Sequence, residues 1–366
     1  MEGLSKMPFN KYSLSLRKQN GAVILVLLMA LFIFGTSLFL GAANSNSLEL
    51  RNNSEVRYQL EQAKTALLSY AQNYPSFDKD ANTNGDTDDE GPGRLPCPDY
   101  DNDGLQNPSN ALGCNTHVRG RLAEYIVLPS GSRFSLNDTF KGLDQQLWYV
   151  VSEDFREITG GNVNSNTAPE LSLDGESGYV AIIISPGEQL GFQDRTADPN
   201  DPANYLEGVN AIDTGTSFVN SFSSPDTFND IAVGITWSEL MTAATLKVVQ
   251  EVKAVMDLHH DSTYFGYEPY PYYPEDDYYY TIYNDPAYDW WEFPRMMIRA
   301  TTGYSYPYPW EVTYPNNLDW YLDENWDNRI NYTKVSQDSV QITFDNCAIT
   351  YTVTHDAGIT RDQPYC

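Results

Sequence analysis

The sequence predicts an α+β fold, in which a long N-terminal α-helix, transmembrane in its first half, packs on an antiparallel β-sheet head with large loop insertions. Three observations support this prediction. An apolar run without charged residues extends from Gly21 to about Ala43. Apolar residues at helical spacing follow this run, and apolar or alternating segments of strand length occur further along the chain.

The apolar run is long enough to span a bilayer, because about 20 helical residues cross the hydrocarbon core. A signal-peptide core normally has about 7–15 residues, so the run is too long for the simplest cleaved signal. Small residues at 40–44 leave a cleaved signal as the alternative. The preceding flank is basic and places the N-terminus in the cytoplasm and the rest on the far side. Its charged residues are Glu2, Lys6, Lys11, Arg17 and Lys18.

Residues 44–75 are predicted to form an amphipathic helix that continues the first one and ends at Pro75. The apolar positions, separated by steps of three and four, are Val56, Leu60, Ala63, Leu67 and Tyr70. The alternative is a membrane anchor followed by a separate helix, with a break at residues 44–46.

Three strands and a further helix are predicted in the head. The strand-like runs cover 124–128, 146–151 and 178–185. A helix is expected over 237–258, because Thr236 and Glu239 have the spacing of a capping box. Its buried stripe consists of Leu240, Met241, Ala244, Val248, Val252, Val255 and Met256.

The chain changes composition after residue 264. Tyr, Trp, Pro and Asp dominate up to residue 332, and this many prolines disfavour helix or central strand. The segment is expected to form either an irregular aromatic layer on the domain or an exposed binding surface. Residues 338–354 alternate in hydrophobicity and predict a closing β-hairpin.

The net charge of −28 makes nucleic acid a poor partner and suits divalent cations. The sharpest local signal is the sequence from Asp99 to Gly104, which resembles the first half of an EF-hand calcium loop. A glutamate at position twelve is missing, and Asn110 stands there, so an outside ligand would have to complete the site. The expected ligands are Asp99, Asp101, Asp103, the Leu105 carbonyl and Asn107.

An upstream loop repeats this spacing, with Gly85 at the sixth position and Glu90 close to the twelfth. Its expected ligands are Asp80, Asn82, Asn84, the Asp86 carbonyl and Asp88. The alternative for both loops is that Asp, Asn and Gly simply form turns. Two such loops close together favour calcium as a cofactor.

The four cysteines all lie beyond the apolar run, and an even number in an oxidising compartment favours disulfides. Zinc is the rival interpretation, but no CxxC or HxxxH spacing supports it. Sequence proximity suggests the pairs Cys97–Cys114 and Cys347–Cys366.

Catalysis has little support in the sequence. The chain has four histidines and neither a GxSxG nor an HExxH motif. We therefore expect a protein that is not an enzyme, with a secreted calcium-dependent hydrolase as the third alternative.

The N-terminus resembles the leader of type IV prepilins and type II secretion pseudopilins, through Arg17-Lys-Gln-Asn-Gly-Ala22 and the apolar run. The resemblance implies that a prepilin peptidase cuts after Gly21 and methylates Ala22. It also implies that the subunit leaves the inner membrane by packing its N-terminal helix against other pilins or pseudopilins in a filament.

Segments of the head also look like a group of large pilin-like proteins, so the resemblance covers about residues 11–258. These segments are 67–71, 93–99, 120–122, 146–152, 201–208 and 228–230. The Cys347–Cys366 pair is similar to the C-terminal disulfide loop of many pilins. Major subunits carry Glu at mature position five, whereas this chain has Val26 there and no acidic residue before Glu49. That departure is expected of a minor subunit at a filament tip.

The resulting expectation is a minor pilin or pseudopilin in five parts. They are a leader (1–21), a transmembrane and filament-core helix (22–43), an amphipathic helix (44–75), a calcium-type head (76–258) and an aromatic region with a disulfide-bonded hairpin (259–366). It would be a single-pass inner-membrane protein with a periplasmic C-terminal domain. The alternative is a membrane-anchored periplasmic or surface binding protein or adhesin that uses the aromatic segment as its contact face.

Overall fold

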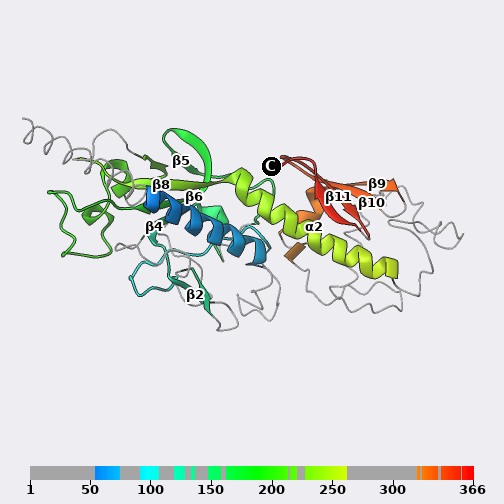
Figure 1. Cartoon of the computed structure of the whole chain (residues 1–366), viewed down its shortest axis with the longest axis horizontal. Helices are drawn as coiled ribbons and strands as arrows, with labels where there is room; N and C mark the ends of the chain where they lie inside the picture. The colour runs from blue at the N-terminus through cyan, green and yellow to red at the C-terminus, as the bar shows by residue number, and fades with distance from the viewer. Residues whose placement is uncertain are drawn as a thin grey trace, which may run out of the picture. The chain divides into compact units, whose positions relative to one another are not determined.

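The computed structural model divides the chain into two units, residues 1–55 and 56–366, and nearly all described residues belong to the second unit (Figure 1). All the strands of the described fold lie in that second unit. The described ranges are 54–74, 91–106, 119–127, 133–136, 147–157, 162–212, 215–220, 227–261, 320–321, 324–336, 339–355 and 357–366.

The predicted long N-terminal helix is wrong. Within the described ranges the first helix covers only residues 54–73, a second helix follows much later, and most of the remaining regular structure is β-strand. Residues 22–43, expected to form the filament-core helix, lie outside the described ranges, as do residues 44–53. The helical spacing of apolar residues gave the position of the 54–73 helix but could not establish its continuity with the apolar run.

Neither described helix is long and apolar enough to cross a membrane. The prediction of a single-pass membrane protein, with a cytoplasmic N-terminus and a periplasmic domain, is therefore wrong. Both helices carry charged residues, as a helix with one solvent-facing side does.

The central sheet has the spatial order β1-β4-β6-β5-β7, and β8 also pairs with β6. All pairings are antiparallel except that of β5 with β7. The strands are β1 (Arg119–Arg121), β4 (Trp148–Val151), β5 (Leu171–Leu173), β6 (Glu176–Ser185), β7 (Ser217–Phe218) and β8 (Ile231–Thr236). The runs predicted at 146–151 and 178–185 are thus confirmed as strands.

Both faces of this sheet are buried. Along β6, Ala181 and Ile183 belong to one hydrophobic cluster, whereas Ile182 and Ile184 belong to another. Successive side chains of a strand point to opposite faces, which explains why an unbroken apolar run forms this strand. On β8, a Cβ placed on Gly234 would lie 2.2 Å from the ring of Tyr179, so the glycine makes room for that ring.

The helix over 54–73, drawn in blue in Figure 1, contributes buried residues to the first of these clusters. Lys64 Nζ donates to the Gly234 carbonyl at 2.9 Å, and the amide of Gly93 donates to the Ala71 carbonyl at 2.9 Å. The buried residues are Leu60, Ala63, Leu67, Tyr70 and Ala71. The apolar stripe predicted for this helix therefore faces the core, except that Val56 is half-buried.

Helix α2 (Trp237–Asp261) follows directly on β8. Its predicted capping box is confirmed, because the Glu239 amide donates to Thr236 Oγ1 (3.2 Å) and the Thr236 amide donates to Glu239 Oε2 (2.9 Å). The predicted stripe is buried at Leu240, Met241, Ala244, Val248 and Val252, whereas the side chains of Val255 and Met256 are not among the described ones.

A second, fully antiparallel sheet has the order β12-β11-β10-β9. Its strands are β9 (Ile330–Ser336), β10 (Ser339–Phe344), β11 (Cys347–Thr354) and β12 (Gly358–Arg361). The hairpin predicted over 338–354 is therefore confirmed. This sheet packs on α2, where Tyr351 Oη lies 2.9 Å from Thr245 Oγ1.

Shorter elements complete the described fold. Strand β2 (Tyr125–Val127), within the strand-like run predicted at 124–128, pairs with β3 (Arg133–Ser135). The short 3-10 helices are η3 (Glu153–Phe155), η4 (Pro202–Asn204), η5 (Gly208–Ala211) and η7 (Trp326–Asn328). The part of the aromatic region that the structure describes lies in the hydrophobic core, since Trp320, Tyr321 and Trp326 are buried. That end fits the aromatic-layer alternative.

Candidate functional site

The predicted calcium loop is built around the Asp99 carboxylate. Its Oδ1 accepts from the Asn102 amide (2.7 Å) and its Oδ2 accepts from the Gly104 amide (2.9 Å). The Leu105 amide donates to Asp103 Oδ1 at 2.8 Å. Asn102 and Gly104 both have positive φ values, 61° and 87°, which glycine and asparagine tolerate best. The loop therefore curls back over Asp99, as its Asp-Asn-Gly composition predicts.

Strand β1 holds this loop in place. Asp99 and Arg121 exchange two backbone hydrogen bonds, of 2.9 Å and 2.7 Å. Gly120, next to Arg121 on β1, allows this close approach, because a Cβ there would lie 2.5 Å from the Asp99 carbonyl oxygen. The loop is thus fixed to the rigid central sheet at one side.

Three carboxylates converge on the loop. Asp99, Asp101 and Asp103 each place one oxygen within 4.8 Å of the others. Asp99 is buried, and this burial raises the pKa of its carboxyl to about 6, with a smaller contribution from the Asp103 charge and an opposing one from the two amides. The charges and oxygen donors fit a hard cation such as calcium. The same hydrogen bonds also form in an Asx turn without an ion, so calcium stays a prediction.

A fourth acidic side chain lies beside the loop and was missed in the sequence. The amide of Glu124 donates to the Gly104 carbonyl at 2.9 Å, and a Cβ placed on Gly104 would lie 3.8 Å from Glu124 Oε2. The EF-hand pattern lacks its acidic twelfth residue, and only the fold shows that Glu124 comes close to the loop. No local signal in the sequence could have identified it.

Several predicted site residues lie outside the described ranges. They are Gly21, Ala22, Asp80, Asn82, Asn84, Asp86, Asp88, Asn107 and Cys114. The predicted disulfide Cys347–Cys366 is confirmed and joins the start of β11 to the end of the chain. Cys97 is also disulfide-bonded, and its expected partner is among the residues outside those ranges.

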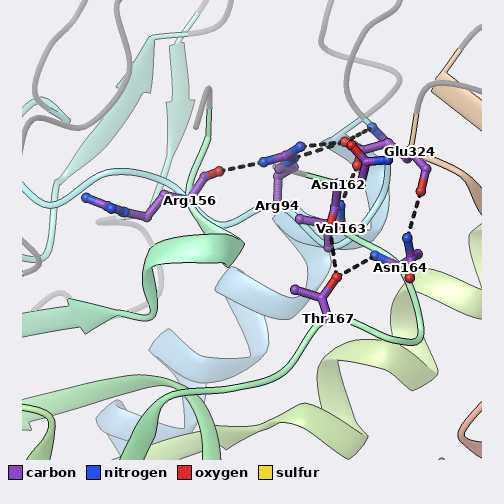
Figure 2. Close-up of polar contacts among 8 residues, drawn as sticks. Arg94, Arg156, Asn162, Val163, Asn164, Thr167 and Glu324 are labelled. Carbon is purple, nitrogen blue, oxygen red and sulfur yellow. Dashed lines mark hydrogen bonds and ion pairs between the residues drawn. The ribbon is translucent and has the colours of Figure 1, made fainter. Parts of the chain in front are cut away.

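A buried ion pair connects the segment before the calcium-type loop to the C-terminal part of the chain (Figure 2). Arg94 Nη2 lies 2.6 Å from Glu324 Oε1, and both side chains are almost inaccessible to solvent. Glu324 also accepts from the amides of Gly91 and Val163, and its backbone carbonyl accepts from Asn164 Nδ2 at 2.8 Å. One carboxylate therefore joins three segments that are distant in the sequence.

The same network extends to the C-terminal end of η3, the short helix after β4. Arg94 Nη1 donates to the Arg156 carbonyl at 3.0 Å, and the amide of Leu95 donates to the Phe155 carbonyl at 2.8 Å. Burial raises the pKa of Glu324, while Arg94 and the two amides act in the opposite direction. The partners of Arg94 and Glu324 are too far apart in sequence for any motif to indicate the pair.

A second buried cation lies on the other side of the central sheet. The guanidinium of Arg121 stacks between the rings of Trp148 (4.0 Å) and Tyr205 (4.1 Å) and donates to the Pro199 carbonyl at 2.9 Å. Burial lowers the pKa of Arg121 to about 10. The stack binds the segment after β6 to the sheet through cation–π contacts.

No protein-family profile, curated protein or solved structure is significantly similar to this chain.

Proposed function

We propose that this protein is a minor pilin- or pseudopilin-type subunit, a structural, non-enzymatic component of a type IV pilus or type II secretion filament, at its tip. The proposal rests first on the leader motif ending at Gly21 and on the absence of an acidic residue at Val26. Its partners are other subunits of this type and a prepilin peptidase.

The structural observation that carries the proposal is that four of the six head motifs of the resemblance form one hydrogen-bonded module. These four are the segments 67–71, 93–99, 120–122 and 147–152. Each is bonded through its backbone to the next, by Gly93 N to Ala71 O (2.9 Å), Asp99 N to Arg121 O (2.9 Å) and Leu122 N to Leu147 O (2.8 Å). The other two described motifs, 201–208 and 228–230, contact each other through Glu207 and Asp230.

This connectivity supports the interpretation of the motifs as a structural signature. Chance matches spread along a chain would not be expected to meet in consecutive order in space. The module combines a helix, a disulfide-bonded loop and the first strands of an antiparallel sheet. Together with the C-terminal Cys347–Cys366 disulfide, it supports a compact head for a filament subunit.

Calcium is proposed as the ion that stiffens this head. The three converging carboxylates and the adjacent Glu124 support that role, with the oxygen ligands coming from Asp99, Asp101 and Asp103. A hard cation there would connect the acidic loop to the β1–β2 segment, which already bonds to it through Gly104.

The alternative, a binding protein that uses the aromatic region as its contact face, has weaker support. The described end of that region buries Trp320, Tyr321 and Trp326 in the core. Buried aromatic side chains serve packing and leave less ring surface for a partner.

The test is the mass of the N-terminal peptide after co-expression of the full chain with an active prepilin peptidase. We expect a peptide that begins at N-methyl-Ala22. Gly21→Val should block processing, whereas the same substitution at Gly41 should leave it intact. An unprocessed Met1 peptide in the wild type would overturn the proposal.

A further inference from the structure

Two acidic residues lie buried together at the base of the long connection between β6 and β8. Glu207 is 1% exposed and Asp230, immediately before β8, is fully buried. The connection between the two strands contains η4, η5 and β7. Ionised carboxylates are seldom buried in a pair without a compensating cation or proton, because the loss of hydration and their mutual repulsion both disfavour it.

The two carboxyl groups are held by a reciprocal set of hydrogen bonds. Glu207 Oε2 accepts from the amides of Asn229 (3.0 Å) and Asp230 (3.1 Å), and Glu207 Oε1 accepts from Gln193 Nε2 (2.6 Å). In return, Asp230 Oδ2 accepts from the Glu207 amide and from Asn210 Nδ2, both at 3.0 Å. Each acid thus binds the other's backbone.

One oxygen of this arrangement has no donor. Asp230 Oδ1 is inaccessible to solvent and has no hydrogen-bond partner among the described residues. Leaving a buried carboxylate oxygen unsatisfied is costly, because the folded protein does not replace the hydrogen bonds that water makes to it. The side chains of Asp230 and Glu207 are within hydrogen-bonding reach of each other. A proton on one of the two carboxyl groups would therefore convert an acceptor into a donor and join the two acids directly.

We propose that Glu207 and Asp230 share one proton at neutral pH, and that this carboxyl–carboxylate pair is a pH-sensitive clasp that holds the connection over 186–230 against the start of β8. The pair satisfies the remaining oxygen and carries a single negative charge. This inference does not depend on the filament function.

The surrounding charges are consistent with a single negative charge on the pair. Arg195, on the same connection, interacts favourably with both acids, and Arg119 on β1 donates to the Asn210 carbonyl at 2.6 Å. Burial, followed by the charge of Glu207, raises the pKa of Asp230 to about 8, and the Glu207 amide and Asn210 oppose that rise.

A proton fits this site better than a metal ion. Three of the four carboxylate oxygens already accept hydrogen bonds from N–H groups. The positive ends of these N–H groups would repel a cation bound to the same oxygens. Calcium requires about six to eight oxygen ligands, and the neighbouring amide groups of Gln193 and Asn210 present nitrogen instead.

The clasp gives stability a definite pH dependence. Between an unfolded pKa near 4 and the folded value of about 8, the folded protein retains a proton that the unfolded chain releases. Its stabilising effect is therefore complete below about pH 4, decreases as the pH rises, and is lost above about pH 8.

The test compares thermal unfolding of the full chain and of Asp230→Asn from pH 5 to pH 9. The amide of the variant mimics the protonated acid at every pH. The unfolding midpoint of Asp230→Asn minus that of the wild type should therefore increase by several degrees as the pH rises from 5 to 9. Glu188→Gln, which alters an exposed carboxylate of the same connection, should give a pH-independent difference. A constant difference for Asp230→Asn would overturn the proposal.

A second measurement does not depend on the stability of a variant. Infrared difference spectra between pH 6.5 and pH 9.5 should show the loss of a protonated carboxyl band in the wild type and in Glu188→Gln, and the band should be weaker in Asp230→Asn by the contribution of the pair. The raised pKa values of Asp99 and Glu324 affect all three proteins equally. If the band is no weaker in Asp230→Asn, the pair does not hold a proton. Stabilisation by added calcium that disappears in Asp230→Asn but persists in Asp101→Ala would identify a cation site instead and would also overturn the proposal.

Discussion

Lys64 Nζ, on the 54–73 helix, lies 2.7 Å from Oε1 of Glu239, the residue that completes the capping box of α2. The same nitrogen donates to the Gly234 carbonyl on β8. Glu239 thus links helix capping to the packing of the first helix on the sheet. The two side chains are 14% and 26% exposed, so the pair is only partly screened by solvent.

We expect Glu239→Gln and Lys64→Met to show a coupling energy of about 0.5–1 kcal/mol in a double-mutant cycle. The glutamine retains the capping geometry and removes only the charge. The measurement is urea unfolding at neutral pH. A coupling energy near zero would mean that the contact contributes nothing beyond its hydrogen bonds.

The Lys64–Glu239 pair also predicts a loss of stability in acid. Burial raises the pKa of Glu239, but the bonds from Lys64 and Thr236 outweigh it and leave the pKa below its ordinary value. A lowered acid pKa stabilises the folded state at neutral pH, and that effect is lost as the pH falls below about 4.3. Glu239→Gln should therefore be less sensitive to acid than the wild type in unfolding titrations between pH 5 and pH 2.

Glu324→Gln should destabilise the protein by about 3–5 kcal/mol, because it leaves the buried Arg94 guanidinium without its charged partner. Denaturant unfolding measures the loss. Glu153→Gln is the matched control, since Glu153 pairs with Arg156 but its side chain is 66% exposed. If both variants had equally small effects, the Arg94–Glu324 pair would not fasten the three segments.

Chelation of calcium should lower the melting temperature of the wild type. The double substitution Asp101→Ala and Asp103→Ala should abolish that difference, because it removes two of the three converging carboxylates. Asp194→Ala, at an exposed aspartate that bonds within its own turn to Thr196, should leave the response intact. An unchanged melting temperature on chelation would rule out a structural ion.

Removal of the Cys347–Cys366 disulfide, by serine at both positions, should cost about 3 kcal/mol in the chain-entropy model, since the cysteines are 19 residues apart. The loss should appear as earlier chemical unfolding without a change in the α2 contacts of Tyr351. A variant as stable as the wild type would contradict this estimate.

The features that the sequence could predict depend on short-range patterns. The capping box of Thr236 and Glu239, the 338–354 hairpin and the run at 178–185 each contain their own signal within a few residues. The spacing of apolar residues correctly predicted the 54–73 helix and most of its buried side chains. The prediction of one long N-terminal helix was wrong because periodicity identifies helical segments but does not show whether two of them form one continuous helix.

The features that could not be predicted are contacts between residues that are far apart in the sequence. Arg94 and Glu324 form an ion pair although they are 230 residues apart in sequence, and Glu207 contacts Asp230 after an irregular connection. Neither pair has a local spacing rule, and in a chain this acidic a carboxylate alone carries little information. Glu207 and Asp230 do lie within two of the pilin-like motifs, but those motifs indicate no contact between them.

Strand β6 places similar residues on its two sides, since Ile182, Ile183 and Ile184 alternate between two buried clusters. If β6 shifted by one residue relative to β8, one isoleucine would replace another on each face of the sheet. Hydrophobicity alone therefore opposes this change of register only weakly. Alignment of β6 with β8 must therefore depend on shape, above all on the fit of the Tyr179 ring over Gly234. Filling that notch with an alanine methyl group would test whether one missing side chain keeps the strands correctly aligned.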